Sequence, residues 1–356
     1  MAELDVPGEQ YRAAIGMYDE AGMRAGGKLI AMLPRTSPIG KWLLTALVLA
    51  GLVFAIRHFA QFEQFVALAR KAQPIWLLAA LALQALTYLS VAAGWSAVLR
   101  RAGSSQPITR LIPVAISKLF ADQAIPGAGL GGSLLLIEHL TRLGTPRGAA
   151  MAALLVSMIG YYASYAVLAL VMLFVLWSHS QATPLLTGLV TTFLIVAIAI
   201  PSLALWLRRR GSQPLPPRIE QIGPLQKLLQ IVGEAPERLI RDKALVGKVT
   251  LFNGSVFLAD AATLAACLLA VGEPLDLPTA FIALMAGSIA MTLTPIPLGL
   301  GTFEASCIGM LTLLGVPIEP AVAATLLLRG MTLWLPLALG LVLLRGGGKR
   351  TGRAGE

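Results

Sequence analysis

Two charged residues stand inside long apolar stretches, where a charge needs a partner or a role. Asp260 lies at the middle of the apolar window 249–272, and Arg329 lies three residues from the middle of 320–344. Three residues of helix rise by about 4.5 Å, so we expect both side chains at similar depth. Either they form a buried ion pair that joins two helices, or Arg329 binds a phosphate with Asp260 as counter-charge or proton carrier.

Two further stretches are rich in proline and glycine. They read Ile125-Pro-Gly-Ala-Gly-Leu-Gly-Gly132 and Pro295-Ile-Pro-Leu-Gly-Leu-Gly301. Proline removes a backbone donor and glycine loosens a helix, so each is predicted to be a non-helical break within an apolar segment. Their free amides would offer an anion site, or the glycines would serve close helix packing. The strand and the Lys-Ser/Thr pair of a nucleotide loop are missing.

Carboxylates stand beside both breaks. Glu304 follows the second break by three residues, where it would cap the returning helix or contact a cationic or hydroxylated headgroup. Asp122 lies shortly before the first break and four residues after Lys118, and Glu138 precedes Arg142 by four. This spacing places each pair on one helix face and predicts salt bridges. If the first break reaches the membrane midplane, Asp122 is instead part of a deep polar site.

The composition is that of a membrane protein. Of 356 residues, 56% are hydrophobic and 13% charged, with a mean hydropathy of +0.76, which excludes an ordinary water-soluble globule. The net charge of +10 points to topology and anionic lipid headgroups, since the basic, aromatic stripe of nucleic-acid binders is missing. The two cysteines and three histidines, whose positions give no metal-ligand spacing, predict no disulfide framework, metal site or cofactor. They are Cys267, Cys307, His58, His139 and His179.

Six spanning helices are predicted from windows with few charges. The windows are 42–56, 72–99, 148–178, 180–207, 249–272 and 320–344. Five of them are long enough for a hydrocarbon core of about 30 Å. The first needs its flanks, which gives a tilted span of 38–60.

The two broken segments belong to an internal repeat. At an offset of 171, Pro126 maps to Pro297 and Leu143-Gly144 to Leu314-Gly315; at 170, Gly129 and Gly131 map to Gly299 and Gly301. We interpret each break as the tip of a re-entrant hairpin, about 111–143 and 279–315. Nearly all loops rich in Lys and Arg then share one face, cytoplasmic by the positive-inside rule, and the hairpins enter from opposite sides. Only the loop 57–73 does not fit.

The predicted fold is an all-α polytopic integral membrane protein, with six spanning helices and two oppositely oriented re-entrant helical hairpins in an inverted repeat. Its parts are a cytoplasmic tail (1–37), a first half with the membrane anchor and first hairpin (38–207), a basic cytoplasmic loop (208–248), a second half with the second hairpin (249–345) and a basic cytoplasmic tail (346–356). The loop 208–248 holds nine basic and four acidic residues. It is either a solvated connector or an amphipathic segment, around 222–239, that binds anionic headgroups.

The sequence resembles a known family at three places: the stretch 125–132, Thr294-Pro-Ile-Pro-Leu-Gly-Leu-Gly-Thr-Phe-Glu304, and Leu326-Leu-Leu-Arg329. From about Trp76 to Leu344 it is similar to the lysylphosphatidylglycerol synthase transmembrane region family, the flippase-like domain. The resemblance implies a site made of Pro297, Gly299, Gly301, Glu304 and Arg329, with Pro126, Gly127, Gly129 and Gly131 as its counterpart in the first repeat. Two departures matter. We find no C-terminal soluble aminoacyl-transferase domain, so lipid aminoacylation is not expected, and Ile296 and Leu298 stand where the family often has glycine.

The resemblance implies translocation of a polar lipid headgroup, of a phospholipid or lipid-linked precursor, across a bacterial-type inner membrane. The positive-inside rule predicts that both termini are cytoplasmic. To the implied site we add Asp122 and Asp260 as candidate substrate-binding residues, and no residue is assigned a catalytic role. The alternative is a membrane-embedded enzyme, or a non-catalytic partner, in lipid or polyprenyl-phosphate modification. Expected partners are membrane lipids, anionic headgroups at 208–248, and either a second copy of the chain or a lipid-modifying enzyme, but no nucleic acid.

Overall fold

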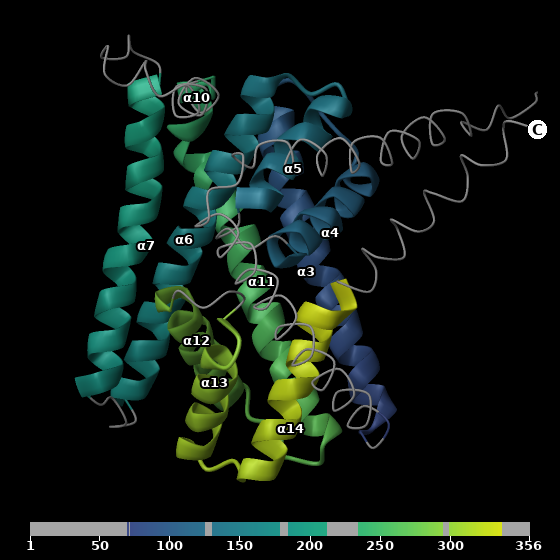
Figure 1. Cartoon of the computed structure of the whole chain (residues 1–356), viewed down its shortest axis with the longest axis vertical. Coiled ribbons are helices and arrows are strands. Elements are labelled where there is room, and N and C mark those ends of the chain that lie inside the picture. The colour runs from purple at the N-terminus through teal and green to yellow at the C-terminus, as the bar shows by residue number, and fades with distance from the viewer. Residues whose placement is uncertain are drawn as a thin grey trace, which may run out of the picture. The chain divides into compact units, whose positions relative to one another are not determined.

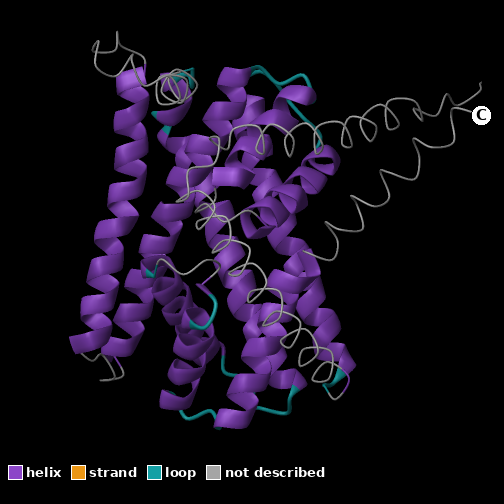
Figure 2. Ribbon diagram, viewed as in Figure 1, coloured by secondary structure: helices purple, strands orange, loops and turns teal. Residues whose placement is uncertain are grey.

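The computed structural model describes residues 70, 72–124, 130–178, 184–211, 234–294 and 299–336. The chain divides into two units, and the unit discussed below covers Ala67–Leu333. Its described residues form helices joined by short loops, without a strand among them (Figure 2). The predicted span 38–60 and the tails 1–37 and 346–356 lie outside the described residues.

Four long helices match four of the predicted spans. They are α3 (Pro74–Arg101), α6 (Arg147–Ser178), α7 (Pro184–Gly211) and α11 (Lys243–Ala270). Each contains a segment long and apolar enough to cross a membrane. Their 28 to 32 residues correspond to about 42 to 48 Å of helix, which exceeds a hydrocarbon core of about 30 Å.

Helices α3 and α11 run antiparallel at the centre of the unit. At one end the Gln73 N–H donates to the Ala270 carbonyl at 2.9 Å, and at the other Arg101 Nε donates to Asp242 Oδ2 at 2.8 Å. We call these ends the Ala270 end and the Asp242 end. Helix α6 packs against both central helices, and α7 packs on α6 (Figure 1).

Two pairs of short helices complete the unit. Helices α4 (Ile108–Ala124) and α5 (Leu130–Arg142) pack on each other near the Asp242 end, where α3 ends and α6 begins. Helices α12 (Leu277–Leu293) and α13 (Thr302–Leu313) pack on each other near the Ala270 end, where α11 ends. Figure 1 shows the two pairs in opposite halves of the unit. After α13, the chain continues through α14 (Ile318–Arg329) into a π-helix, Gly330–Trp334.

The order and lengths of the helices recur along the chain. Helices α3 and α11 both have 28 residues, α4 and α12 both have 17, and α5 and α13 have 13 and 12. The first residues of these three pairs, and of α6 and α14, lie 169 to 172 positions apart. The observed boundaries therefore follow the offset seen in the sequence.

Helix ends recur in the same register. Gly103 and Gly272 have φ of 80° and 95°, and Gly144 and Gly315 have φ of 82° and 96°. In all four turns, the residue after the glycine donates its N–H to the carbonyl five positions earlier, at 2.9 to 3.0 Å. This bond is typical of a glycine-terminated helix, and positive φ strains any residue with a Cβ. Corresponding helices thus end by the same local device.

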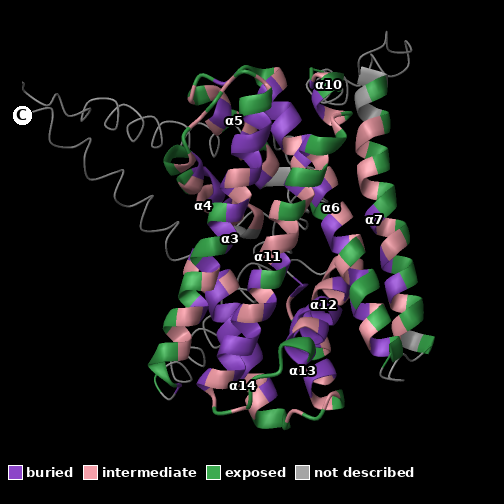
Figure 3. Cartoon of the chain, turned by 180° about the vertical axis from the view of Figure 1, so that it is seen from behind, coloured by how far each residue is buried: buried purple, intermediate pink, exposed green. Residues whose placement is uncertain are grey.

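Buried side chains concentrate where α3, α4, α5, α6 and α11 meet. Trp95, Leu99, Leu111, Leu140 and Val249 are at most 2% exposed there. Elsewhere, large apolar side chains stay exposed on the outer faces of α6 and α7 (Figure 3). They include Phe174, Trp177, Ile195 and Trp206. An apolar outer surface is the one that suits contact with lipid.

The helices extend further than predicted at two places. Residues 130–132 were expected in the first break but begin α5, because the Gly132 N–H donates to Asp122 Oδ1 at 3.1 Å. A Cβ on Gly132 would overlap Asp122, so this glycine serves close approach within a helix. Helix α7 reaches Gly211, and α11 starts at Lys243, where the Asp242 side chain caps it by accepting the Leu245 N–H at 3.1 Å. Both ends of the predicted loop 208–248 are thus helical, and 212–233 lie outside the described residues.

Candidate functional site

A buried ion pair joins α13 to α14. Arg329 Nε lies 2.7 Å from Glu304 Oε1, and each side chain is only 11% exposed. Glu304 belongs to the first turn of α13, and Arg329 is the last residue of α14. An ion pair so far from water is costly to form and more costly to break, because the remaining charge would have no partner.

The second carboxylate oxygen of Glu304 caps α13. It accepts the N–H of Gly301, the residue before α13, at 2.7 Å, which is the capping role that the sequence predicted. The turn before it needs glycine, since Gly299 and Gly301 have φ of 60° and 84°. Thr302 Oγ1 donates to the Gly299 carbonyl at 2.9 Å and lies 3.2 Å from Thr294 Oγ1. The tip of the α12–α13 pair is therefore held by its own hydrogen bonds, with the carboxylate at its centre.

Phe303 supports the guanidinium of this ion pair. The Arg329 Cζ lies 5.0 Å from the centroid of the Phe303 ring, a cation–π contact. The ring packs against Gly287 of α12, where an added Cβ would lie 3.1 Å from it. Gly287 thus leaves the space that places Phe303 beside Arg329.

Polar residues of four helices lie at one level. Arg329 is 11 residues after the start of α14, and Glu304 is nine before the end of α13. Asp260 is ten residues before the end of α11, and Gln84 is ten after the start of α3. The starts of α3 and α14 and the ends of α11 and α13 all lie at the Ala270 end. Each of the four residues is therefore about 14 to 17 Å along its helix from that end. This is about half of a hydrocarbon core of about 30 Å.

Asp260 has a different partner from the one expected. Gln84 Nε2 donates to Asp260 Oδ1 at 2.9 Å and also lies 3.3 Å from Thr263 Oγ1. Among the described residues Arg329 pairs with Glu304, so the predicted pairing of Arg329 with Asp260 is corrected. By helix rise Asp260 and Glu304 are similarly far from the Ala270 end, but Asp260 faces α3 whereas α13 presents Glu304 to α14.

The α4–α5 pair repeats this chemistry in a more exposed form. Lys118 Nζ lies 2.6 Å from Asp122 Oδ2, with side chains 26% and 20% exposed. The other oxygen, Asp122 Oδ1, accepts the Gly132 N–H in the first turn of α5. In both pairs one carboxylate thus bonds a cation and an amide at the start of the second helix. The predicted salt bridge of Glu138 with Arg142 is also present, at 2.6 Å.

Two of the amide donors expected at the breaks are in use. The Gly301 N–H is bonded to Glu304, and the Gly132 N–H to Asp122. The structure brings Gly299, Gly301, Glu304 and Arg329 together. Asp122 lies in the α4–α5 pair, and Asp260 bonds to Gln84 and not to this group. Gly131 lies in α5 and not in a break. Pro126, Gly127, Gly129 and Pro297 lie outside the described residues.

Sequence reasoning missed Gln84, Phe303 and Tyr88. Gln84 is an amide in the middle of an apolar window, but a neutral side chain indicates a functional site less strongly than a charged one. Tyr88 follows it by one turn, and its Oη is buried without a hydrogen-bond partner among the described residues. Phe303 directly precedes Glu304 in the stretch on which the family resemblance rests.

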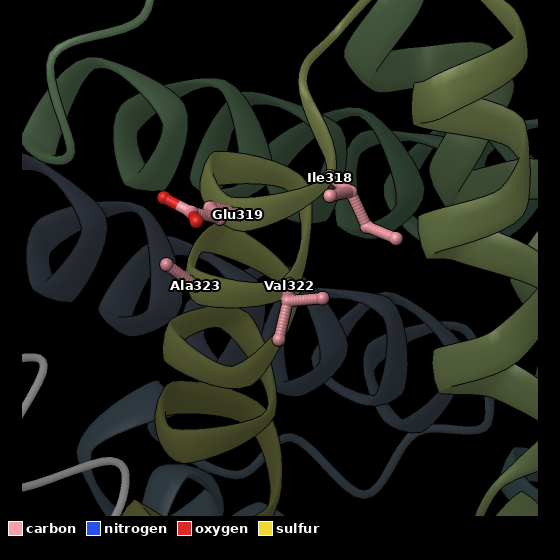
Figure 4. Close-up of a pocket in the computed structure, with 4 residues that line it drawn as sticks. All are labelled: Ile318, Glu319, Val322 and Ala323. Carbon is pink, nitrogen blue, oxygen red and sulfur yellow. The ribbon is translucent and has the colours of Figure 1, made fainter.

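A hollow of about 290 Å³ lies at the first turns of α14, lined by Ile318, Glu319, Val322 and Ala323 (Figure 4). It is open, largely apolar, and about 15 Å of helix from Arg329. It does not include the ion pair. Among the described residues, no group of three or more His, Cys, Asp or Glu side chains is arranged to hold a metal ion.

Comparison with known proteins gives one finding. A family model described as "Lysylphosphatidylglycerol synthase TM region" matches residues 42–340, which include every helix discussed above. A comparison with curated proteins gives no match.

Proposed function

The chain belongs to the lysylphosphatidylglycerol synthase TM region family, and on that premise we propose that it moves a polar lipid headgroup across the membrane. The cargo is a phospholipid or a lipid-linked precursor. Its headgroup passes along a groove between the α4–α5 and α12–α13 pairs while the acyl chains stay in the lipid. The two further spans predicted from the sequence, 38–60 and 320–344, would bring the total to six.

In this proposal the two short pairs are re-entrant hairpins related by an inverted repeat. The recurring helix lengths and the four glycine-terminated helix ends support a duplication. The pairs also begin at opposite ends of the antiparallel helices α3 and α11. Many transporters build their substrate sites from such inverted, broken helices near the midplane.

Charge orients the protein. The Asp242 end carries many of the described basic residues, among them Arg100, Arg101, Arg110, Arg142, Arg147, Arg209, Arg238, Arg241 and Lys243. The Ala270 end carries Glu273, Asp276 and Glu319, with Arg70 as its described basic residue. By the positive-inside rule, the Asp242 end is cytoplasmic. We place both termini on that side of an inner membrane, with anionic headgroups against the segment 208–248.

The Arg329–Glu304 pair is the observation that carries the proposal. Capping of α13 needs only the bond from Glu304 to the Gly301 N–H, so it does not explain an arginine brought to the same depth. A guanidinium is suited to a phosphate, which it binds through two parallel hydrogen bonds. We infer that Glu304 neutralises Arg329 at rest and that a lipid phosphate replaces it during passage.

The α4–α5 pair gives the headgroup a second binding position, which we call the Lys118 station, in addition to the station at Arg329. Asp122 bonds to Lys118 and to the Gly132 amide in the same way as Glu304 bonds to Arg329 and to the Gly301 amide. A phosphate from the cytoplasmic leaflet would meet the Lys118 station first. The proline–glycine segments with Pro126, Gly127, Gly129, Gly131, Pro297 and Gly299 would shape the groove between the stations.

Headgroup accessibility in proteoliposomes tests the proposal. Purified protein is reconstituted with headgroup-labelled phosphatidylglycerol, and a membrane-impermeant quencher reports the labels that reach the outer leaflet. We expect Arg329→Met to slow this exchange at least about tenfold, equivalent to about 1.4 kcal/mol. The matched control is Arg241→Met, because Arg241 is 71% exposed in an ion pair with Glu237, and it should exchange at the wild-type rate.

Two outcomes would overturn the proposal. Wild-type exchange rates in folded Arg329→Met would remove the site. Chemically altered lipid among the extracted products would instead favour the membrane-embedded enzyme. If Arg329→Met fails to fold, the double variant Glu304→Gln/Arg329→Met removes both charges of the pair and replaces the single variant.

A further inference from the structure

Asp260 is a carboxyl group at membrane depth without a cation. Among the described residues it forms no ion pair, although it lies at the level of Glu304 and Arg329. Its hydrogen bond comes from the neutral amide of Gln84, at 2.9 Å. An ionised carboxylate accepts bonds at about four lone-pair positions and is costly in a membrane without a counter-charge. This site therefore suits a neutral carboxylic acid better than a carboxylate.

A second observation in the same place points to a ligand. The Tyr88 side chain, only 8% exposed, has a buried hydroxyl without a partner among the described residues. Tyr88 follows Gln84, the partner of Asp260, by one turn of α3, and the Tyr161 ring of α6 lies 5.2 Å from that of Phe257, three residues before Asp260. Protonated Asp260 is a donor as well as an acceptor, and the Tyr88 oxygen is an acceptor that no described residue uses.

Polar side chains continue from this cluster toward the Asp242 end. Ser255 lies five residues before Asp260 in α11 and donates to Ser90 Oγ of α3 at 3.1 Å. Ser90 follows Tyr88 by two residues. The α3–α11 interface is otherwise mostly apolar, so this pair of hydroxyls is a polar contact on the Asp242 side of the Asp260 cluster.

Among the described residues of the surrounding helices, no cation neutralises Asp260. On α3 the nearest polar groups along the helix are Gln84 and Tyr88, and from α6 Tyr161 contacts Phe257, one turn before Asp260. Helix α12 has no ionisable residue. Helix α14 brings Arg329, which pairs with Glu304 of α13. The charged residues of the short helix α10 (Glu237–Ile240), Glu237 and Arg238, lie at the Asp242 end.

We propose that Asp260 is a proton-binding site whose loading and unloading couples headgroup movement to the proton gradient. The proton binds the Asp260 carboxylate from one side of the membrane and leaves the carboxyl toward the other. Coupling to the headgroup runs through α11, which packs against both α3 and α14 and so contacts the helices that hold Gln84 and Arg329. The inference rests on the proposed function for its coupling but not for the proton site itself.

Infrared spectroscopy tests the proton site without any lipid movement. Difference spectra of the purified protein between acidic and alkaline buffer should contain a protonated-carboxyl stretching band that is absent in Asp260→Asn. Asparagine keeps an oxygen to accept the Gln84 amide, so the variant retains this contact. The matched control is Glu319→Gln, an exposed carboxylate on α14 outside the cluster. An Asp260→Asn spectrum identical to that of the wild type would overturn the assignment.

Imposed gradients test the coupling. In proteoliposomes with headgroup-labelled phosphatidylglycerol, one pH unit acting on one proton per lipid shifts the steady-state distribution by up to about tenfold. We expect this shift in wild type and Glu319→Gln, and none in Asp260→Asn. A response to a sodium gradient alone, or an equal pH response in Asp260→Asn, would overturn the proton assignment. A wild type that moves the lipid but ignores both gradients refutes only the coupling, whereas one that moves no lipid refutes the proposed function.

Discussion

Removing either charge of the Arg329–Glu304 pair should destabilise the protein far more than removing both. In Glu304→Gln, an amide oxygen still accepts the Gly301 N–H, but Arg329 loses its counter-charge. In Arg329→Met, the volume is nearly kept, but Glu304 is left charged. Both side chains are only 11% exposed, so water cannot replace the lost partner, and each single substitution is expected to cost about 3 to 5 kcal/mol.

The double variant carries the decisive measurement. With both charges gone, no desolvated charge remains, and Glu304→Gln/Arg329→Met should be clearly more stable than either single variant. The coupling between the two positions should then be about 3 kcal/mol or more. Unfolding free energies are measured in mixed detergent micelles, where the fraction unfolded is followed by circular dichroism.

A surface pair supplies the control. Arg241 and Glu237 are 71% and 48% exposed and 2.6 Å apart, so the same double-mutant cycle there should give a coupling of at most about 1 kcal/mol. Additive losses at Arg329 and Glu304, or single losses as small as those of the control, would refute the view that this pair is a buried, mutually dependent unit.

Three other expectations concern the turn, the cap and the sidedness. Gly299→Ala should lower the unfolding temperature, because φ is 60° and a Cβ would overlap its neighbour, whereas Gly309→Ala, with open space, should not; equal melting curves would contradict the turn geometry. The Leu245 N–H and the Arg101 side chain hold the pKa of Asp242 below its usual value. The stabilisation that ionised Asp242 gives the folded protein is therefore present above about pH 4 and is lost as the pH falls through the lowered pKa. Asp242→Asn should accordingly be less stable than wild type at neutral pH and equal to it in acid; a gap that persists in acid would contradict this. Cysteines placed at Arg147 and Glu319 should react with impermeant maleimide from opposite sides of the membrane, and labelling of both from one side would contradict the orientation.

The long helices were predictable because their signal is local. Each window without charges is longer than a bilayer core requires, and α3, α6, α7 and α11 follow the predicted windows within about four residues at most ends. The salt bridges Lys118–Asp122 and Glu138–Arg142, and the capping role of Glu304, were also predictable, since both depend on spacings of three or four residues within one helix.

The partner of Arg329 was not predictable in the same way. Depth can be counted along a sequence, but the direction in which a side chain faces depends on how helices pack. Asp260 and Glu304 are both at the level of Arg329, and only the packing of α13 on α14 decides between them. The extent of α5 into the glycine run likewise depends on Asp122, a residue ten positions earlier in the chain, which accepts the Gly132 N–H.

The antiparallel contact of α3 with α11 has a consequence for biogenesis. Gln84 emerges from the ribosome 176 residues before its partner Asp260, which at 5 to 20 residues per second is an interval of about 10 to 35 s. During that time Gln84, with Tyr88 one turn away on α3, has entered the translocon, but α11, which carries its partner, has not yet been made. Until α11 is made, the first half depends on the insertion machinery or on its own neighbouring helices to cover these polar groups.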